Sequence, residues 1–296
     1  MRRLFAFLAV VLFSVTLTFA QGVQSDDDHH DNGPIQAGYA VVTPVVVTTS
    51  VTSGGTTTTV TTSSSGLVVF ETFGLRYDGG ASAIQAGVLP PDLTTNAMLF
   101  VDSEGRLGKN IGVAIVNPNS GNVNVNLTLL KGDGTTAATG MLNVPSHQQV
   151  SKMVTQLFAP GATIPTDVTG TLLISSTSLP VSVIGLRFRG ANFSTIPATD
   201  LSASNVALPN ITADAGGAGA ILLPQFAAGG GWATELVLIN SGTGPMTVRV
   251  DLFKQDGTPL STGLNGKTAS SFIGINIPAG GVVVLAPRDP AGDDDF

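Results

Sequence analysis

The stretch Val123-Asn-Val-Asn-Leu-Thr-Leu-Leu-Lys-Gly-Asp-Gly134 decides the fold of this chain. Apolar and polar residues alternate along its first seven positions, so one face is apolar and the other is polar. This period of two is typical of a β-strand with one face in a core and one in water. Asp133-Gly134 then predicts a tight turn. The preceding run Val113–Val116 is apolar throughout and predicts a strand covered on both faces.

The same pattern returns 123 positions later in the sequence. Ile111-Gly-Val-Ala-Ile-Val-Asn117 aligns without a gap with Thr234-Glu-Leu-Val-Leu-Ile-Asn240, and Met246 to Leu252 alternate as Val123 to Leu129 do. The residues that are identical in the two copies, named in the first, are Asn117, Gly121, Val125, Leu129, Lys131, Asp133, Gly134 and Thr135. Repetition at this spacing predicts two domains of one design.

Composition agrees with an all-β protein made of two tandem β-sandwich modules. Val and Thr suit pleated strands, and the 36 glycines and 17 prolines suit many turns. We expect a complete sandwich at residues 96–200, a linker at 201–220 and a second, incomplete module at 221–290. With no cysteine, a disulfide framework and a thiolate metal site are both excluded.

One short helix is expected in the first module. Ser146 is a suitable N-cap, and Gln149 stands three residues later as in a capping box. Apolar residues then recur at helical spacing at Val150, Met153 and Leu157. The second copy has no such pattern and runs from Pro278 directly into a strand.

A closing hairpin of the first module ends in Ile184-Gly-Leu-Arg-Phe188, which has a twin in Phe73-Gly-Leu-Arg-Tyr77. The second module stops near Pro287, before any such ending. Strands within residues 66–95 are therefore candidates to complete the second module. Donation within one chain gives a closed monomer, whereas donation between chains gives a head-to-tail fibre.

The beginning of the chain predicts export. Met1-Arg2-Arg3 and the short apolar run Leu4–Phe19 are typical of a signal peptide at residues 1–20, and the run is short for a membrane anchor. An acidic and then Thr/Ser/Val-rich leader follows at residues 21–65, and residues 50–65 are expected to be a linker. We expect a secreted or cell-surface protein of bacterial type, with no membrane span after cleavage.

Charge excludes nucleic acid as a partner. The formal net charge of −7 comes mainly from acidic ends at residues 26–31 and 291–296. Between them 13 acidic and 11 basic residues are spread without a basic stripe, so neither nucleic acid nor anionic lipid is favoured.

No catalytic, cofactor-binding or metal-binding residues are predicted. His29 and His30 lie in the acidic leader without a rigid frame, and His147 lies in a predicted helix turn with no nucleophile motif nearby. The interior acids are expected at solvated turns and outward strand positions. Arg76 and Arg187 share a repeated position that favours a structural contact.

Trp232 and Tyr77 form the only candidate ligand surface. Trp232 is the single tryptophan and follows three glycines, and an exposed aromatic on a β-sandwich can stack on a sugar ring. The alternative, local packing of the ring, is the one that the sequence favours, since a sugar platform usually uses two or three aromatic residues. Tyr39 is the other tyrosine.

Three features together resemble a group of bacterial extracellular tandem-repeat proteins: the Gly-Leu-Arg-Phe/Tyr ending, the Ile-Val-Asn-Pro turn and the approach Phe226–Trp232. The resemblance covers about residues 66–287 and implies immunoglobulin-like β-sandwich modules, secretion and no reaction. The chain departs from true immunoglobulin domains in lacking the cysteine pair. The expected function is a non-enzymatic structural or adhesion role, with no cofactor. The alternatives are binding of a surface polysaccharide and a fibre subunit that binds copies of itself.

Overall fold

The computed structural model describes residues 38–42, 47–53, 56–62, 69–76, 82–159, 164–190, 192–202, 221–230 and 232–287. The predicted signal peptide, Tyr77, most of the predicted linker and the acidic tail lie outside these ranges. Within them the chain is all-β, as predicted. None of the described segments is a helix with the length and hydrophobicity to cross a membrane.

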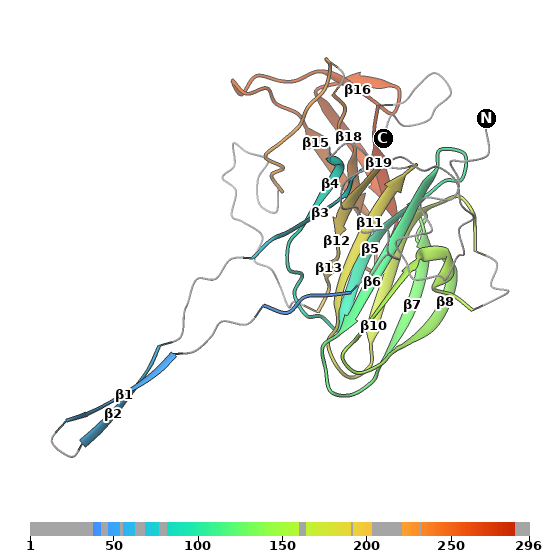
Figure 1. Cartoon of the computed structure of the whole chain (residues 1–296). Coiled ribbons are helices and arrows are strands. Elements are labelled where there is room, and N and C mark those ends of the chain that lie inside the picture. The colour runs from blue at the N-terminus through green and yellow to red at the C-terminus, as the bar shows by residue number, and fades with distance from the viewer. Residues whose placement is uncertain are drawn as a thin grey trace, which may run out of the picture.

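Two antiparallel sheets make a sandwich near residues 96–200, which we call the first sandwich (Figure 1). The larger sheet has the order β13-β5-β10-β7-β8, and the smaller has the order β12-β11-β6-β9. The larger comprises β5 (Asn96–Ser103), β7 (Val123–Lys131), β8 (Thr136–Val144), β10 (Val168–Ser176) and β13 (Thr199–Asp200). The smaller comprises β6 (Lys109–Asn117), β9 (Gln148–Met153), β11 (Ser182–Arg189) and β12 (Asn192–Pro197).

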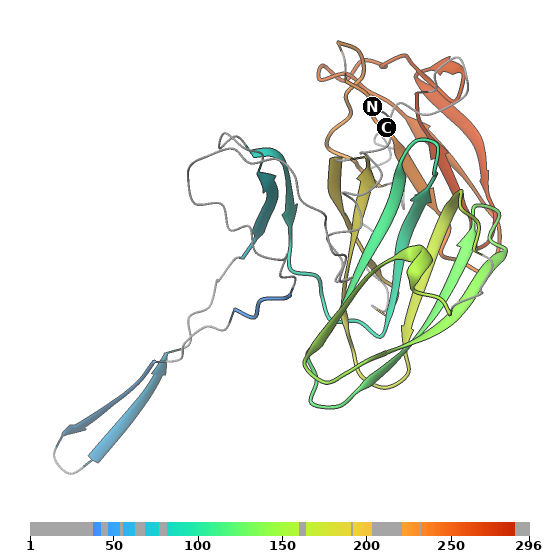
Figure 2. The ribbon, with the colours of Figure 1, turned by 45° about the vertical axis from the view of Figure 1, so that its right-hand side comes forward.

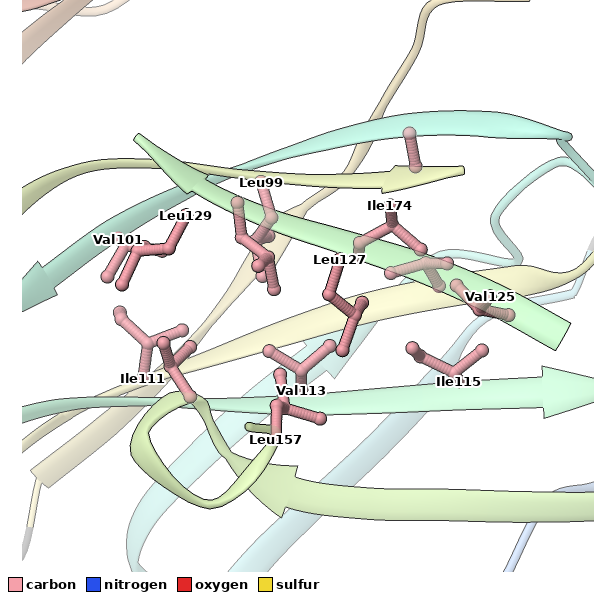
Figure 3. Packing of buried hydrophobic residues seen from close by; sticks show 14 of the residues in the cluster. Leu99, Val101, Ile111, Val113, Ile115, Val125, Leu127, Leu129, Leu157 and Ile174 are labelled. Atoms are coloured by element: carbon pink, nitrogen blue, oxygen red, sulfur yellow. The ribbon is translucent and has the colours of Figure 1, made fainter. Parts of the chain in front are cut away.

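The core lies between these two sheets, and the alternation along β7 is confirmed. Val123, Val125, Leu127 and Leu129 are buried, while the asparagines between them are exposed. Figure 3 shows side chains from the two layers pointing toward one another. Burying each such apolar side chain contributes about 1.5–3 kcal/mol, so this row stabilises the first sandwich together with the apolar residues that face it from the other sheet.

The order of the strands differs from that of an immunoglobulin domain. There the first and second strands are neighbours in one sheet. Here β5 pairs with β10 and β13, while β6 pairs with β9 and β11 in the other sheet. The sandwich architecture is therefore present with a different connectivity.

The predicted helix is wrong over most of its length. Gln148–Met153 is strand β9, paired with β6, and only Val154–Gln156 forms one 3-10 turn. The Ser146 hydroxyl donates to Asn119 O at 3.0 Å and caps no helix. The ladder to β6 satisfies six residues in a row, and this tertiary pairing overrides a helical pattern of only about three turns.

A second unit, the C-terminal module (residues 221–287), contains only short ladders. Its strands are β14 (Leu236–Ile239), β15 (Met246–Asp251), β16 (Thr262–Leu264), β17 (Lys267–Ala269), β18 (Ser271–Ile277) and β19 (Val282–Leu285). They pair as β14–β19, β15–β18 and β16–β17. A small core is centred on Leu236, Leu252, Leu264, Phe272 and Leu285.

Asn117 and Asn240 occupy matching places in the two units. The Asn117 side-chain amide donates to Gly121 O at 2.8 Å and to Val144 O at 3.0 Å. That of Asn240 donates to Gly244 O at 2.7 Å and to Ile277 O at 3.1 Å. Both residues are fully buried, so each amide ties the end of one strand to the turn that follows it.

Two hairpins precede the first sandwich. β1 (Val47–Ser53) pairs with β2 (Thr56–Thr62), where a linker was expected, and β3 (Glu71–Arg76) pairs with β4 (Ser82–Val88). The β3–β4 hairpin does not join the C-terminal module of its own chain, in contrast to the within-chain form of the sequence-based hypothesis. It docks on β12, because the ring of Phe73 stacks on that of Phe193 with centroids 5.2 Å apart and the Thr195 hydroxyl donates to Gly87 O at 2.7 Å.

Candidate functional site

Trp232 is placed at the surface, as a ligand platform requires. It closes a turn with Gly229, in which each backbone amide donates to the carbonyl of the other residue at 3.0 Å. Gly229 and Gly230 both adopt positive φ, which glycine tolerates best. The tryptophan is 73% exposed, so packing does not hold its ring. The alternative of local packing is not what the structure shows.

The rest of the predicted aromatic surface does not assemble among the described residues. Tyr77 lies outside them. The hydroxyl of Tyr39 donates to the carbonyl of His147 at 3.0 Å, in the turn between β8 and β9. The ring contacts of the described residues involve Phe73, Phe188 and Phe193 and not Trp232. Trp232 is thus a single exposed ring.

An ionic cluster that sequence reasoning missed joins the first sandwich to the C-terminal module. Asp102 lies on β5, Lys109 on β6 and Arg187 on β11, while Glu235 directly precedes β14. The Arg187 guanidinium lies 3.0 Å from Asp102 and 2.9 Å from Glu235, and Lys109 lies 3.2 Å from Asp102. All four side chains are largely buried. The cluster has two charges of each sign.

Electrostatics explains why Arg187 keeps its charge in this buried place. Burial by itself disfavours the charged guanidinium, but the ion pairs with Glu235 and Asp102 outweigh it and raise the pKa of Arg187 above its usual value. The sequence predicted that Arg187 packs over apolar surface, whereas the structure places its guanidinium between two carboxylates. The predicted outward placement was wrong for Asp102 and Glu235, because the first sandwich and the C-terminal module meet over them.

The cluster has little capacity for chemistry. A pair of catalytic carboxylates needs a cleft that admits substrate, and each carboxylate here binds a cation directly. A proton donor or acceptor also needs reach to a reacting group. We therefore assign the four residues to holding the two units together.

Two other interior acids lie at solvated turns, as predicted. Asp133 accepts hydrogen bonds from the amide and hydroxyl of Thr135 at 2.9 and 2.6 Å, and Asp256 accepts the same two from Thr258. These bonds hold the pKa of each aspartate below its usual value, the side-chain bond contributing most. Gly134 and Gly257 follow with φ of 81° in both turns.

A groove of about 370 Å³ runs between the β4–β5 connection and β11 to β13. Its polar groups bind one another, since the Thr94 hydroxyl donates to Asp200 at 2.5 Å and the Ser202 hydroxyl donates to the same oxygen at 2.6 Å. Because these groups already bind one another, the groove resembles the seam between packed segments more than a ligand cavity. Its lining includes Gly87 to Asp92, Val183, Ile184, Thr195 and Pro197.

The C-terminal module has a row of apolar residues (Met246, Val248, Val250 and Leu252) that is partly exposed, whereas the matching row of β7 is buried. Met246 stands at the place of Val123 in the alignment, and it is 43% exposed whereas Val123 is completely buried. Val248 and Val250 are half-buried, while their counterparts Val125 and Leu127 are buried. Only the last member of the row, Leu252, is closed off.

A second apolar stretch of the C-terminal module is also exposed. Ile221, Leu222 and Leu223 stand 123 positions after Met98, Leu99 and Phe100, which are buried in β5. The three later residues form no strand and are between 62% and 75% exposed. Exposed apolar residues in a row are typical of an interaction site.

Unpaired strand edges accompany this open surface. In the first sandwich β6 pairs with β9 and β11, and β7 pairs with β8 and β10. Among the described residues, the matching strands of the C-terminal module have one partner each, β19 for β14 and β18 for β15. An edge of this kind has free amide and carbonyl groups that can pair with another strand.

His147 lies in a turn and not in the predicted helix, while His29 and His30 lie outside the described residues. His147 has φ of 53° in the turn before β9, at the place that Gly280 takes before β19 with φ of 66°. Groups of three or more metal-ligand residues are absent from the described ranges. Neither a family model, nor a curated protein, nor a solved structure matches this chain.

Proposed function

We propose that this chain is an exported, non-enzymatic structural protein of adhesion type, which assembles at the cell surface or in the extracellular space through its C-terminal module. The exposed row that begins at Met246 carries the proposal. The matching row of the first sandwich is buried. Its exposure in the C-terminal module therefore leaves apolar surface that a protein partner can cover. The sequence of residues 1–20 supports export.

A finer description of the fold belongs to this proposal. We infer that the two units are tandem copies of one sandwich that is immunoglobulin-like in its two-sheet architecture but not in its connectivity, the second being incomplete. The matching contacts of Asn117 and Asn240 support this, as do the matching turns at Asp133 and Asp256. The mutual neutralisation of the buried ionic cluster supports a role without catalysis.

Light scattering over a dilution series tests assembly. The wild-type protein is expected to exceed the monomer mass at high concentration. Val248→Asp places a charge in the open row and is expected to leave only monomer, because burying an unpaired carboxylate is strongly unfavourable. Thr247→Asp is the matched control, since Thr247 lies on the opposite, exposed face of β15. Wild-type protein that stays monomeric throughout contradicts the proposal.

Binding of a polysaccharide is a second candidate, favoured by the exposure of Trp232 alone. Stacking on a sugar ring requires a free aromatic face, and this residue has one. Retention on insoluble polysaccharide that is lost in Trp232→Ala and kept in Phe253→Ala supports it, since Phe253 is also an exposed aromatic of the module. Equal retention of both variants and wild type excludes Trp232 as the platform.

A further inference from the structure

The C-terminal module lacks three particular strands. In the first sandwich β10 lies between β5 and β7, and β11 lies between β6 and β12. The C-terminal module has counterparts of β6 and β7 in β14 and β15, and of β5 in residues 221–223. No described strand of the module corresponds to β10, β11 or β12. The lack of a β10 counterpart accounts both for the open edge of β15 and for the unpaired Ile221 to Leu223.

Strands that match the missing three precede the first sandwich. A shift of 111 positions carries Glu71, the first residue of β3, onto Ser182, the first residue of β11. The same shift carries Gly74-Leu75-Arg76 onto the identical Gly185-Leu186-Arg187. It also carries β2 onto residues 167–173, within or next to β10, and β4 onto residues 193–199, which overlap β12. Order and spacing are therefore both preserved.

The matching strands do not pair with the C-terminal module of their own chain. The β3–β4 hairpin is held on β12 by the Phe73–Phe193 stack, and the module is held at Arg187 by Glu235. Figures 1 and 2 both show β1–β2 extending away from the body and away from β14 to β19. The edge of β3 that does not face β4 has no strand partner among the described residues.

We propose that β2, β3 and β4 of one chain complete the C-terminal module of a second copy of this chain. This rests on the proposed function and names the partner. By analogy with β11 on β6, β3 adds antiparallel to β14 with Thr72 opposite Leu238 and Gly74 opposite Leu236. By analogy with β10 on β7, β2 adds to β15 through the edge that does not pair with β1.

Three features of the interface favour this occupant. The unpaired backbone amide and carbonyl groups of β14 and β15 gain hydrogen bonds to the added strands. The exposed apolar side chains from Met246 to Val250 become buried. The β3–β4 hairpin can keep its contact with β12 of its own chain, since β3 pairs through its other edge.

The assembly is head-to-tail. The donor strands and the acceptor module are different surfaces of one chain, so each added copy presents a new acceptor. A heterologous contact of this kind propagates into a filament unless the rotation between copies closes a ring. The proposal therefore predicts species longer than dimers.

Engineered cysteines test the register, because the chain has no cysteine of its own. Two single variants, Thr72→Cys and Leu238→Cys, are mixed and oxidised. The proposal expects a disulfide-linked heterodimer at a yield about tenfold or more above that of Thr72→Cys with Thr247→Cys, because paired strands raise the effective concentration of the two thiols. Glu71→Cys with Ile239→Cys is a second register pair in case one variant folds poorly.

Each outcome decides the proposal. A cross-link between chains supports it. The double variant Thr72→Cys/Leu238→Cys carries both cysteines in one chain. A disulfide that forms only within that chain, at monomer mass, overturns the proposal, because the strands then complete the module of their own chain. Loss of assembly in Val248→Asp with no cross-link in either register pair overturns the donor strands and leaves the proposed function standing. A wild-type protein that never exceeds monomer mass overturns both.

Discussion

Arg187 binds Glu235 through both of its terminal nitrogens, at 2.9 and 3.2 Å. The two residues are 48 positions apart and belong to different units, since Arg187 lies on β11 and Glu235 precedes β14. The contact is a bidentate pair in a largely dry place, a geometry in which charge-assisted hydrogen bonds are strongest. It fixes the C-terminal module on one end of the first sandwich.

Arg187→Met is expected to lower the free energy of unfolding by about 3–5 kcal/mol, because it leaves Asp102 and Glu235 buried with only Lys109 to balance them. Arg249→Met is the matched control. Its pair with Asp251 is exposed at the arginine and is expected to contribute about 0–1 kcal/mol. Urea unfolding measures both variants. Equal losses would contradict a special role for the buried cluster.

Gly134→Ala is expected to weaken the contact between the two units, whereas Gly257→Ala is not. Both glycines have φ of 81°, so alanine costs about 1–2 kcal/mol of backbone strain at either site. A Cβ on Gly134 would also lie 2.0 Å from the carbonyl oxygen of Ala279, while one on Gly257 meets nothing within 4 Å. Limited proteolysis should release the C-terminal module faster in Gly134→Ala alone. Equal release from both variants would count against this contact.

Asn117→Ala and Asn240→Ala are each expected to lower stability by about 1–3 kcal/mol, because buried carbonyl groups lose their donor. Hydrogen exchange locates the loss, which should stay within the unit that carries the substitution. Asn143→Ala is the control, as its bond to Asn124 is exposed and its loss is expected to change stability by about 0.5 kcal/mol or less. A small loss of stability in Asn240→Ala would mean that the hydrogen bonds of this side chain do not stabilise the C-terminal module.

Acid should weaken the two Asp-Gly-Thr turns. The folded pKa values of Asp133 and Asp256 lie below the usual value, so each carboxylate stabilises the fold above that usual value. This contribution is lost as the pH falls through the folded pKa. Thr135→Val and Thr258→Val remove the main cause and should move each pKa upward. Carboxyl-carbon NMR titration measures the midpoints, and unchanged midpoints would show that the threonines do not set them.

Local pattern was sufficient for the strands whose side chains alternate. The period of two in Val123 to Leu129 and the Asp-Gly turn after it are properties of consecutive residues, so they can be read without knowing the partner strands. The all-β class was predictable for this reason. The exposure of Trp232 did not follow in this way, because the sequence favoured local packing of the ring and only the structure leaves it exposed.

What the sequence by itself determined is therefore the alternating strands and the Asp-Gly turns, because hydrophobic period and turn chemistry act over a few residues. Only the tertiary structure decided that residues 148–153 pair with β6, that β3–β4 docks on β12, and that Asp102 and Glu235 meet at Arg187. These outcomes depend on which edges and faces come together in space. That choice is made by the free energy of long-range pairing and burial, which no local pattern contains.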